Sequence, residues 1–235
     1  MKKFIIVLML LGTLAFMPHA PTFAGQITIT RITGYFQDNF NGGEFNITPD
    51  ESLQWALNNY SAFAKVDGGF ESFCLEQNEY VSLGASYEYK ITAGAIRGGV
   101  TNSFDEISVG TAWLYKQFAA GTLNGYDYNK DLSRASSAKA LQEAIWWLED
   151  EIILSNPSNN TFVKAVLDNF NGEAAAKANN SGTYNVAVLN LYSYDNAGNL
   201  VYNQDQLIIT PEPATLLLLG ITLVGFAGLR RKFGG

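Results

Sequence analysis

The chain contains a single cysteine, Cys74, and the residues around it limit what its thiol can do. Cys74 lies in a short aromatic and aliphatic run, residues 70–76, whose composition predicts a strand. A second residue with a reactive group, Gln142, stands one turn before Ile145 and Trp146. Its carboxamide is therefore expected at the edge of a buried helical stripe, where it needs a partner.

The element that must position Gln142 is a predicted amphipathic helix over residues 133–152. Its N-cap would come from Ser133, Ser136 or Ser137. Apolar residues recur at spacings of three and four, as expected for one buried face of a helix. They are Ala138, Leu141, Ile145, Leu148 and Ile152.

The N-terminus has the form of a secretory signal peptide over residues 1–24. Lys2 and Lys3 precede an apolar run, residues 4–16, and the small-residue site ends at Ala24, after which cleavage is expected. Exported domains that are stabilised by disulfides would show an even number of cysteines. Cys74 is therefore a buried thiol, an intermolecular link or a chemically modified residue.

The two sites together resemble the thioester domains of bacterial surface proteins. The matching runs are Phe73-Cys74-Leu75 and Gln142-Glu143-Ala144-Ile145-Trp146, and Leu141 stands where the family usually has Thr. The resemblance implies a covalent Cys74–Gln142 thioester in an adhesin that bonds to an amine- or hydroxyl-bearing surface polymer or protein. The surround that would exclude water consists of Phe73, Leu75, Trp113, Ala144, Ile145 and Trp146. The alternative is an ordinary buried Cys74 and a solvated Gln142.

Several classes of function are excluded or disfavoured. The only histidine, His19, lies in the expected signal peptide, which excludes Ser-His-Asp and Cys-His hydrolases and the common zinc sites. Residues 25–210 hold ten Lys and Arg against twenty-one Asp and Glu, a net charge of −11, which argues against nucleic-acid binding. Asp127, Asn129 and Asp131 start like a calcium loop, but the required Gly and the closing Glu are missing. We predict no metal, no cofactor and no enzymatic activity.

The order of the predicted elements indicates an α+β body, residues 25–210, with a β-sandwich or barrel and a helical insertion. Strands are predicted at residues 26–36, 70–76, 87–92, 186–194, 200–202 and 207–209. Helices are predicted at residues 107–120, 133–152 and 161–170, and a further one over residues 51–65.

The C-terminal residues, 211–232, combine three features of a sorting signal. Pro211-Glu212-Pro213 precedes sixteen apolar or small residues, which are followed by Arg230, Arg231 and Lys232. As a helix this apolar run spans about 24 Å, slightly less than a bilayer core of about 30 Å, and the basic cluster would stay cytoplasmic. The tail resembles the PEP-CTERM sorting signal. This resemblance implies a transient inner-membrane anchor, cleavage by an exosortase and release to the cell surface or extracellular matrix.

Two other functions compete with the covalent binder. The aromatic content of 13% also suits a non-covalent structural or carbohydrate-binding protein of the matrix. A hydrolase with paired carboxylates would use Glu149, Asp150 and Glu151, although consecutive acids at a helix end are usually solvated.

Overall fold

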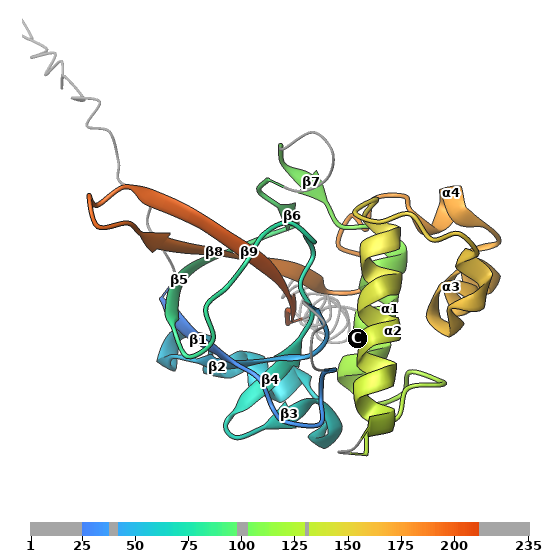
Figure 1. Cartoon of the computed structure of the whole chain (residues 1–235), viewed down its shortest axis with the longest axis horizontal. Helices are drawn as coiled ribbons and strands as arrows, with labels where there is room; N and C mark the ends of the chain where they lie inside the picture. The colour runs from blue at the N-terminus through green and yellow to red at the C-terminus, as the bar shows by residue number, and fades with distance from the viewer. Residues whose placement is uncertain (1–24, 38–41, 98–102, 130–131, 212–235) are drawn as a thin grey trace, which may run out of the picture.

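A computed structural model describes residues 25–37, 42–97, 103–129 and 132–211 (Figure 1). These residues form a mixed α+β structure with one large antiparallel sheet, which confirms the predicted class. The expected signal peptide, residues 1–24, and nearly all of the sorting tail lie outside the described residues.

Seven strands form the large sheet in the order β3-β4-β2-β1-β5-β8-β9, and every adjacent pair is antiparallel. β1 shows why the sheet is stable: Ile27 and Ile29 are buried on one face, as period-two alternation requires. The strands are β1 (Gln26–Thr30), β2 (Phe45–Pro49), β3 (Lys65–Val66), β4 (Gly69–Ser72), β5 (Ser86–Thr92), β8 (Val186–Tyr194) and β9 (Leu200–Ile209); β6 (Gly94–Ala95) and β7 (Asp105–Glu106) form a separate pair.

The segment that carries Cys74 connects β4, the second strand from one end of this sheet, to β9 at the other end. Directly after β4, Leu75 N–H donates to the Asp205 carbonyl at 3.1 Å, and Leu207 N–H donates to the Phe73 carbonyl at 3.1 Å. Cys74 itself pairs with Gln206 of β9 in an antiparallel bridge. The predicted strand over residues 70–76 is thus divided into β4 and this bridging segment.

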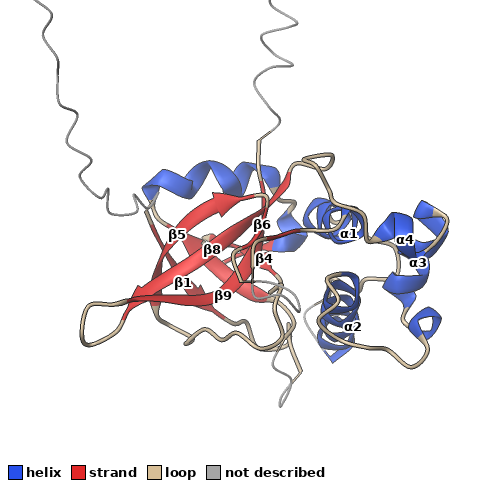
Figure 2. Cartoon of the chain, turned by 90° about the horizontal axis from the view of Figure 1, so that it is seen from above, coloured by secondary structure: helices blue, strands red, loops and turns tan. Residues whose placement is uncertain are grey.

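The helices follow β7 in sequence and lie beside the sheet (Figures 1 and 2). They are α1 (Val109–Ala120), α2 (Leu132–Leu148), α3 (Thr161–Phe170) and α4 (Glu173–Ala176). The N-cap of α1 is Ser108, whose Oγ accepts from Thr111 N–H at 3.1 Å, and its C-cap is Gly121 in the left-handed conformation, φ +73°. α1 and α2 lie side by side, and α3 has its predicted bounds.

α2 differs from its prediction at both ends. It begins at Leu132, so Ser133, Ser136 and Ser137 lie inside it and none is its N-cap. It ends at Leu148 and not at residue 152, because Asp150 adopts φ +59° and Glu151 N–H bonds back to the Trp146 carbonyl at 2.8 Å. This is a Schellman motif, which terminates a helix.

The segment before β4 also differs from its prediction. The sequence predicts one helix over residues 51–65, but these residues form two 3₁₀ helices, η1 (Glu51–Asn59) and η2 (Ala62–Ala64), and then β3. A third 3₁₀ helix, η3 (Pro157–Asn159), precedes α3. The first strand is shorter than predicted and ends at Thr30, whereas β2 was not predicted.

Candidate functional site

Cys74 and Gln142 are in direct contact, although 68 residues separate them in the sequence. The Cys74 thiol lies 3.2 Å from Gln142 Oε1 and donates to it. Both residues have no solvent-exposed surface. The contact joins the segment between β4 and β9 to the middle of α2, which is the arrangement that a Cys–Gln cross-link requires.

The Gln142 carboxamide is fixed by backbone groups on both of its polar atoms. Oε1 accepts from Gly43 N–H and from Cys74 N–H, each at 3.3 Å, and Nε2 donates to the Cys74 carbonyl at 2.7 Å. Two converging N–H groups on a carbonyl oxygen have the geometry of an oxyanion hole, which stabilises the negative charge that forms during nucleophilic attack. These contacts hold the carboxamide carbonyl beside the Cys74 thiol.

Two glycines make this close approach possible. A Cβ atom on Gly42 would lie 2.4 Å from Gln142 Cγ and 2.7 Å from Trp146 Cη2, far inside van der Waals contact. Gly43 has φ +100°, a conformation that side chains disfavour. Both positions therefore require glycine if the backbone is to reach the carboxamide.

Arg31 orients the peptide group between these glycines. Its Nη2 donates to the Gly42 carbonyl at 3.0 Å. The carbonyl and the N–H of one trans peptide point in opposite directions, so this bond turns Gly43 N–H toward Gln142. A hydrogen bond to the carbonyl also polarises the peptide and strengthens its N–H as a donor.

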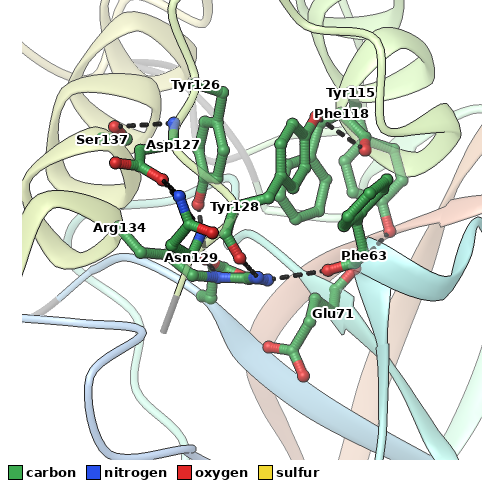
Figure 3. Close-up of polar contacts among 11 residues, drawn as sticks. Phe63, Glu71, Tyr115, Phe118, Tyr126, Asp127, Tyr128, Asn129, Arg134 and Ser137 are labelled. Atoms are coloured by element: carbon green, nitrogen blue, oxygen red, sulfur yellow. Dashed lines mark hydrogen bonds and ion pairs between the residues drawn. The ribbon is translucent and has the colours of Figure 1, made fainter. Parts of the chain in front are cut away.

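A buried ion pair anchors the same segment to α2, and Figure 3 shows its guanidinium, Arg134, among the neighbouring Tyr126 and Tyr128. Arg134 Nε and Nη2 donate to the two carboxylate oxygens of Glu44 at 2.8 and 2.7 Å, and both side chains are buried. Tyr126 Oη donates to the same carboxylate at 2.5 Å, while the guanidinium lies over the Tyr35 ring at 3.6 Å. Glu44 directly follows Gly43, and Arg134 precedes Gln142 by about two helical turns. The ion pair therefore fixes the position of Gly43 relative to Gln142.

The electrostatic surroundings keep the thiol protonated. Burial raises the pKa of Cys74 above its usual range, and the Glu76 carboxylate raises it further. Arg31, backbone hydrogen bonding and the Trp146 side chain act on this pKa in the opposite direction. A neutral, buried thiol is a weak nucleophile and is protected from oxidation.

Five of the six residues expected to surround the site are buried, and the sixth is partly buried. Phe73, Leu75, Ala144, Ile145 and Trp146 are all buried. Phe73 packs edge-to-face on Phe118 of α1, with ring centroids 5.0 Å apart. Trp113 was expected here too, but it is only partly buried and packs edge-to-face on Phe170 of α3, so it belongs to the contact between those helices.

The acids at the end of α2 do not form a paired site. Glu149 accepts from Ser108 N–H and Oγ at 3.1 and 2.8 Å, Asp150 pairs with Lys177, and Glu151 accepts from Gln77 N–H at 3.1 Å. These contacts direct the three carboxylates to different partners.

The polar turn that resembled a calcium loop is also held by hydrogen bonds to its own and neighbouring residues, since Asp127 accepts from Asn129 N–H at 2.9 Å and from Ser133 Oγ at 2.7 Å.

Comparison with known proteins identifies the C-terminal segment. Residues 210–232 match the PEP-CTERM protein-sorting motif, a match that includes Pro211, Glu212, Pro213, Arg230 and Arg231. The chain therefore carries a signal that an exosortase recognises, which implies export to the cell surface or extracellular space. No curated protein and no solved structure matches the chain. Among residues 25–37, 42–97, 103–129 and 132–211, no helix is long and apolar enough to cross a membrane.

Proposed function

We propose that this exported protein is a covalent binder that stores an acyl group as a thioester between Cys74 and Gln142. The observation that supports this best is the 3.2 Å contact between the Cys74 thiol and Gln142 Oε1, an oxygen that also accepts two backbone N–H groups. A solvated glutamine beside an inert buried cysteine would not need this arrangement. The partner, in this proposal, is an amine- or hydroxyl-bearing polymer or protein outside the cell.

The cross-link forms by acyl transfer from nitrogen to sulfur. Cys74 Sγ attacks Gln142 Cδ, and the oxyanion is held by the N–H groups of Gly43 and Cys74. The C–N bond then breaks, the thiol proton goes to the departing nitrogen, and ammonia leaves. The Cys74 carbonyl, which accepts from Nε2 at 2.7 Å, holds the leaving group in place.

Binding reverses the role of the sulfur. A nucleophile on the partner attacks the same carbon, the C–S bond breaks, and the nucleophile's proton returns to Cys74 as the thiol. The partner is left bonded to Gln142 through an amide or an ester. The protein is consumed in a single turnover, which makes it a reagent and not an enzyme.

The test is the intact mass of the purified body before and after exposure to methylamine. The native protein should lack the mass of one ammonia, and methylamine should then add at Gln142 and release an alkylatable Cys74. Cys74→Ala and Gln142→Glu should show neither the deficit nor the uptake, because the first lacks the nucleophile and the second has a carboxylate that is a poor acyl donor.

Gln77→Glu, at an exposed glutamine outside the site, is the matched control and should behave as the native protein. A native mass equal to the sequence mass, in protein never exposed to nucleophiles, would refute the proposal. The body would then be a non-covalent structural or carbohydrate-binding protein of the matrix.

A further inference from the structure

A pocket opens beside the Cys74–Gln142 site and has no role in forming the cross-link. Its volume is about 160 Å³, and it is lined by Arg31, Phe45, Tyr80, Val81, Leu83 and Gln204. Arg31 connects it to the site, since the same guanidinium bonds to the Gly42 carbonyl. Phe45 connects it again, because it stands two residues after Gly43.

A buried acidic residue, Glu76, stands two residues after Cys74 and contacts the pocket residue Gln204. The Glu76 carbonyl accepts from Nε2 of the pocket residue Gln204 at 3.0 Å, and Glu76 Oε2 accepts from Asp205 N–H at 3.1 Å. Oε1 is buried and has no hydrogen-bond partner among the described residues. Glu76 is two residues from Cys74 and close enough to raise the pKa of its thiol. A buried acceptor without a donor is costly and calls for a function.

We infer that the pocket admits a hydroxyl group of a neutral saccharide as the acyl acceptor, and that Glu76 removes the proton of this hydroxyl. The inference rests on the proposed thioester and specifies its acceptor. Aromatic and apolar walls with a few polar groups suit a sugar ring. The positive charge of Arg31 in the lining disfavours the ammonium of a lysine.

The chemistry also favours a hydroxyl. An uncharged amine attacks a thioester without help, whereas a hydroxyl needs a base in the transition state. Burial, followed by the charges of Asp205 and Glu79, raises the pKa of Glu76 well above its usual range, so its carboxylate is a stronger base than an exposed one.

The proton that the hydroxyl loses in the transfer stays within the site and ends on Cys74. The hydroxyl proton passes to Glu76 Oε1 as the oxygen attacks Gln142 Cδ, and the oxyanion is held by Gly43 and Cys74 N–H. The C–S bond then breaks, Glu76 returns the proton to the Cys74 thiolate, and an ester joins Gln142 to the saccharide.

The experiment compares acceptors on the native protein and on Glu76→Gln. Native protein is incubated with maltose, with glycerol and with hydroxylamine, and adducts are followed by intact mass. Glu76→Gln should slow ester formation with maltose roughly 10²-fold, the usual contribution of a general base, and should also slow spontaneous hydrolysis. Its reaction with hydroxylamine, which needs no base, should be unchanged. Glu88→Gln, at a partly buried carboxyl of β5 that is not among the groups acting on the Glu76 pKa, is the matched control and should react normally.

A second variant tests the pocket. Leu83→Trp, at a side chain that is 55% exposed, fills the pocket without disturbing the core. It should suppress acyl transfer to maltose and leave the reaction with hydroxylamine unchanged. The inference is overturned if the native protein shows the ammonia deficit but forms no ester with maltose or glycerol. It is also overturned if Glu76→Gln slows the reaction with hydroxylamine as much as the reaction with maltose. Absence of the ammonia deficit in the native protein would instead refute the thioester itself.

Discussion

The close packing around Gly42 makes a specific prediction for Gly42→Ala. The new Cβ would lie 2.4 Å from Gln142 Cγ, whereas ordinary contact begins at 3.4 Å, so Gln142 must move by about 1 Å. That movement is about a third of the 3.2 Å distance between the thiol and Oε1. Misplacement of a reacting group by about 1 Å can cost roughly 10²-fold in rate. We expect overpacking to lower the free energy of unfolding by about 1–3 kcal/mol.

The assay is the fraction of freshly purified protein that lacks one ammonia, followed over time at constant temperature. Gly110→Ala is the matched control, because its Cβ would lie 2.9 Å from Leu148 Cδ2 and 2.8 Å from the Ala176 carbonyl, in the helical layer. The control should be destabilised to a similar degree and still form the cross-link. Cross-linking of Gly42→Ala at the native rate would refute the argument that the glycine positions the carboxamide.

Three further predictions concern the ion pair, the pH dependence and the tail. Arg134→Met should lower the free energy of unfolding by about 3–5 kcal/mol, because it leaves the Glu44 carboxylate buried without its partner; urea unfolding measures this, and a loss under about 1 kcal/mol would contradict it. Burial, opposed by hydrogen bonds, raises the folded-state pKa of Asp205 to about 7. Its contribution to stability should therefore be complete below the unfolded pKa of about 4 and be lost as the pH rises through about 7, with a slope of up to about 1.4 kcal/mol per pH unit between these values. Asp205→Asn should flatten this dependence of stability on pH, measured by thermal melts from about pH 4 to 8. An unchanged slope would contradict the assignment of the pH dependence to Asp205. An epitope placed after Lys232 should be absent from the exported protein when the exosortase is present; its retention there would exclude tail removal.

The pairing of Cys74 with Gln142 was predictable because it depends on residue types and on helical periodicity. The stripe on α2 indicated that the Gln142 carboxamide lies near a buried face, and a single cysteine in an exported chain raised the question of its partner. The structure brings the two together, and whether the bond forms stays a prediction.

The remaining parts of the site were not predictable, because they depend on contacts between distant segments. Nothing in the local sequence around Gly42 and Gly43 shows that this segment meets α2. Glu44 and Arg134 are 90 residues apart and form a pair only after β2 has joined the sheet. The signal available in this segment was a pair of adjacent glycines followed by a lone acid.

The errors in the predicted secondary structure have similar causes. The apolar spacing continued to Ile152, but backbone hydrogen bonds at Asp150 and Glu151 end the helix earlier. The spacing of apolar residues gives no information about such bonds. The segment 51–65 had enough apolar residues for a helix, and the structure forms tighter 3₁₀ turns there.

The separation of Cys74 and Gln142 along the chain means that the bond would also act on the unfolded state. A cross-link between residues 68 positions apart closes a long loop, and the entropy that it removes from the unfolded chain corresponds to about 4 kcal/mol. The protein would keep this contribution for as long as the thioester stayed intact. Transfer of the acyl group to a partner would release the loop, so attachment and loss of the internal constraint would occur in the same step.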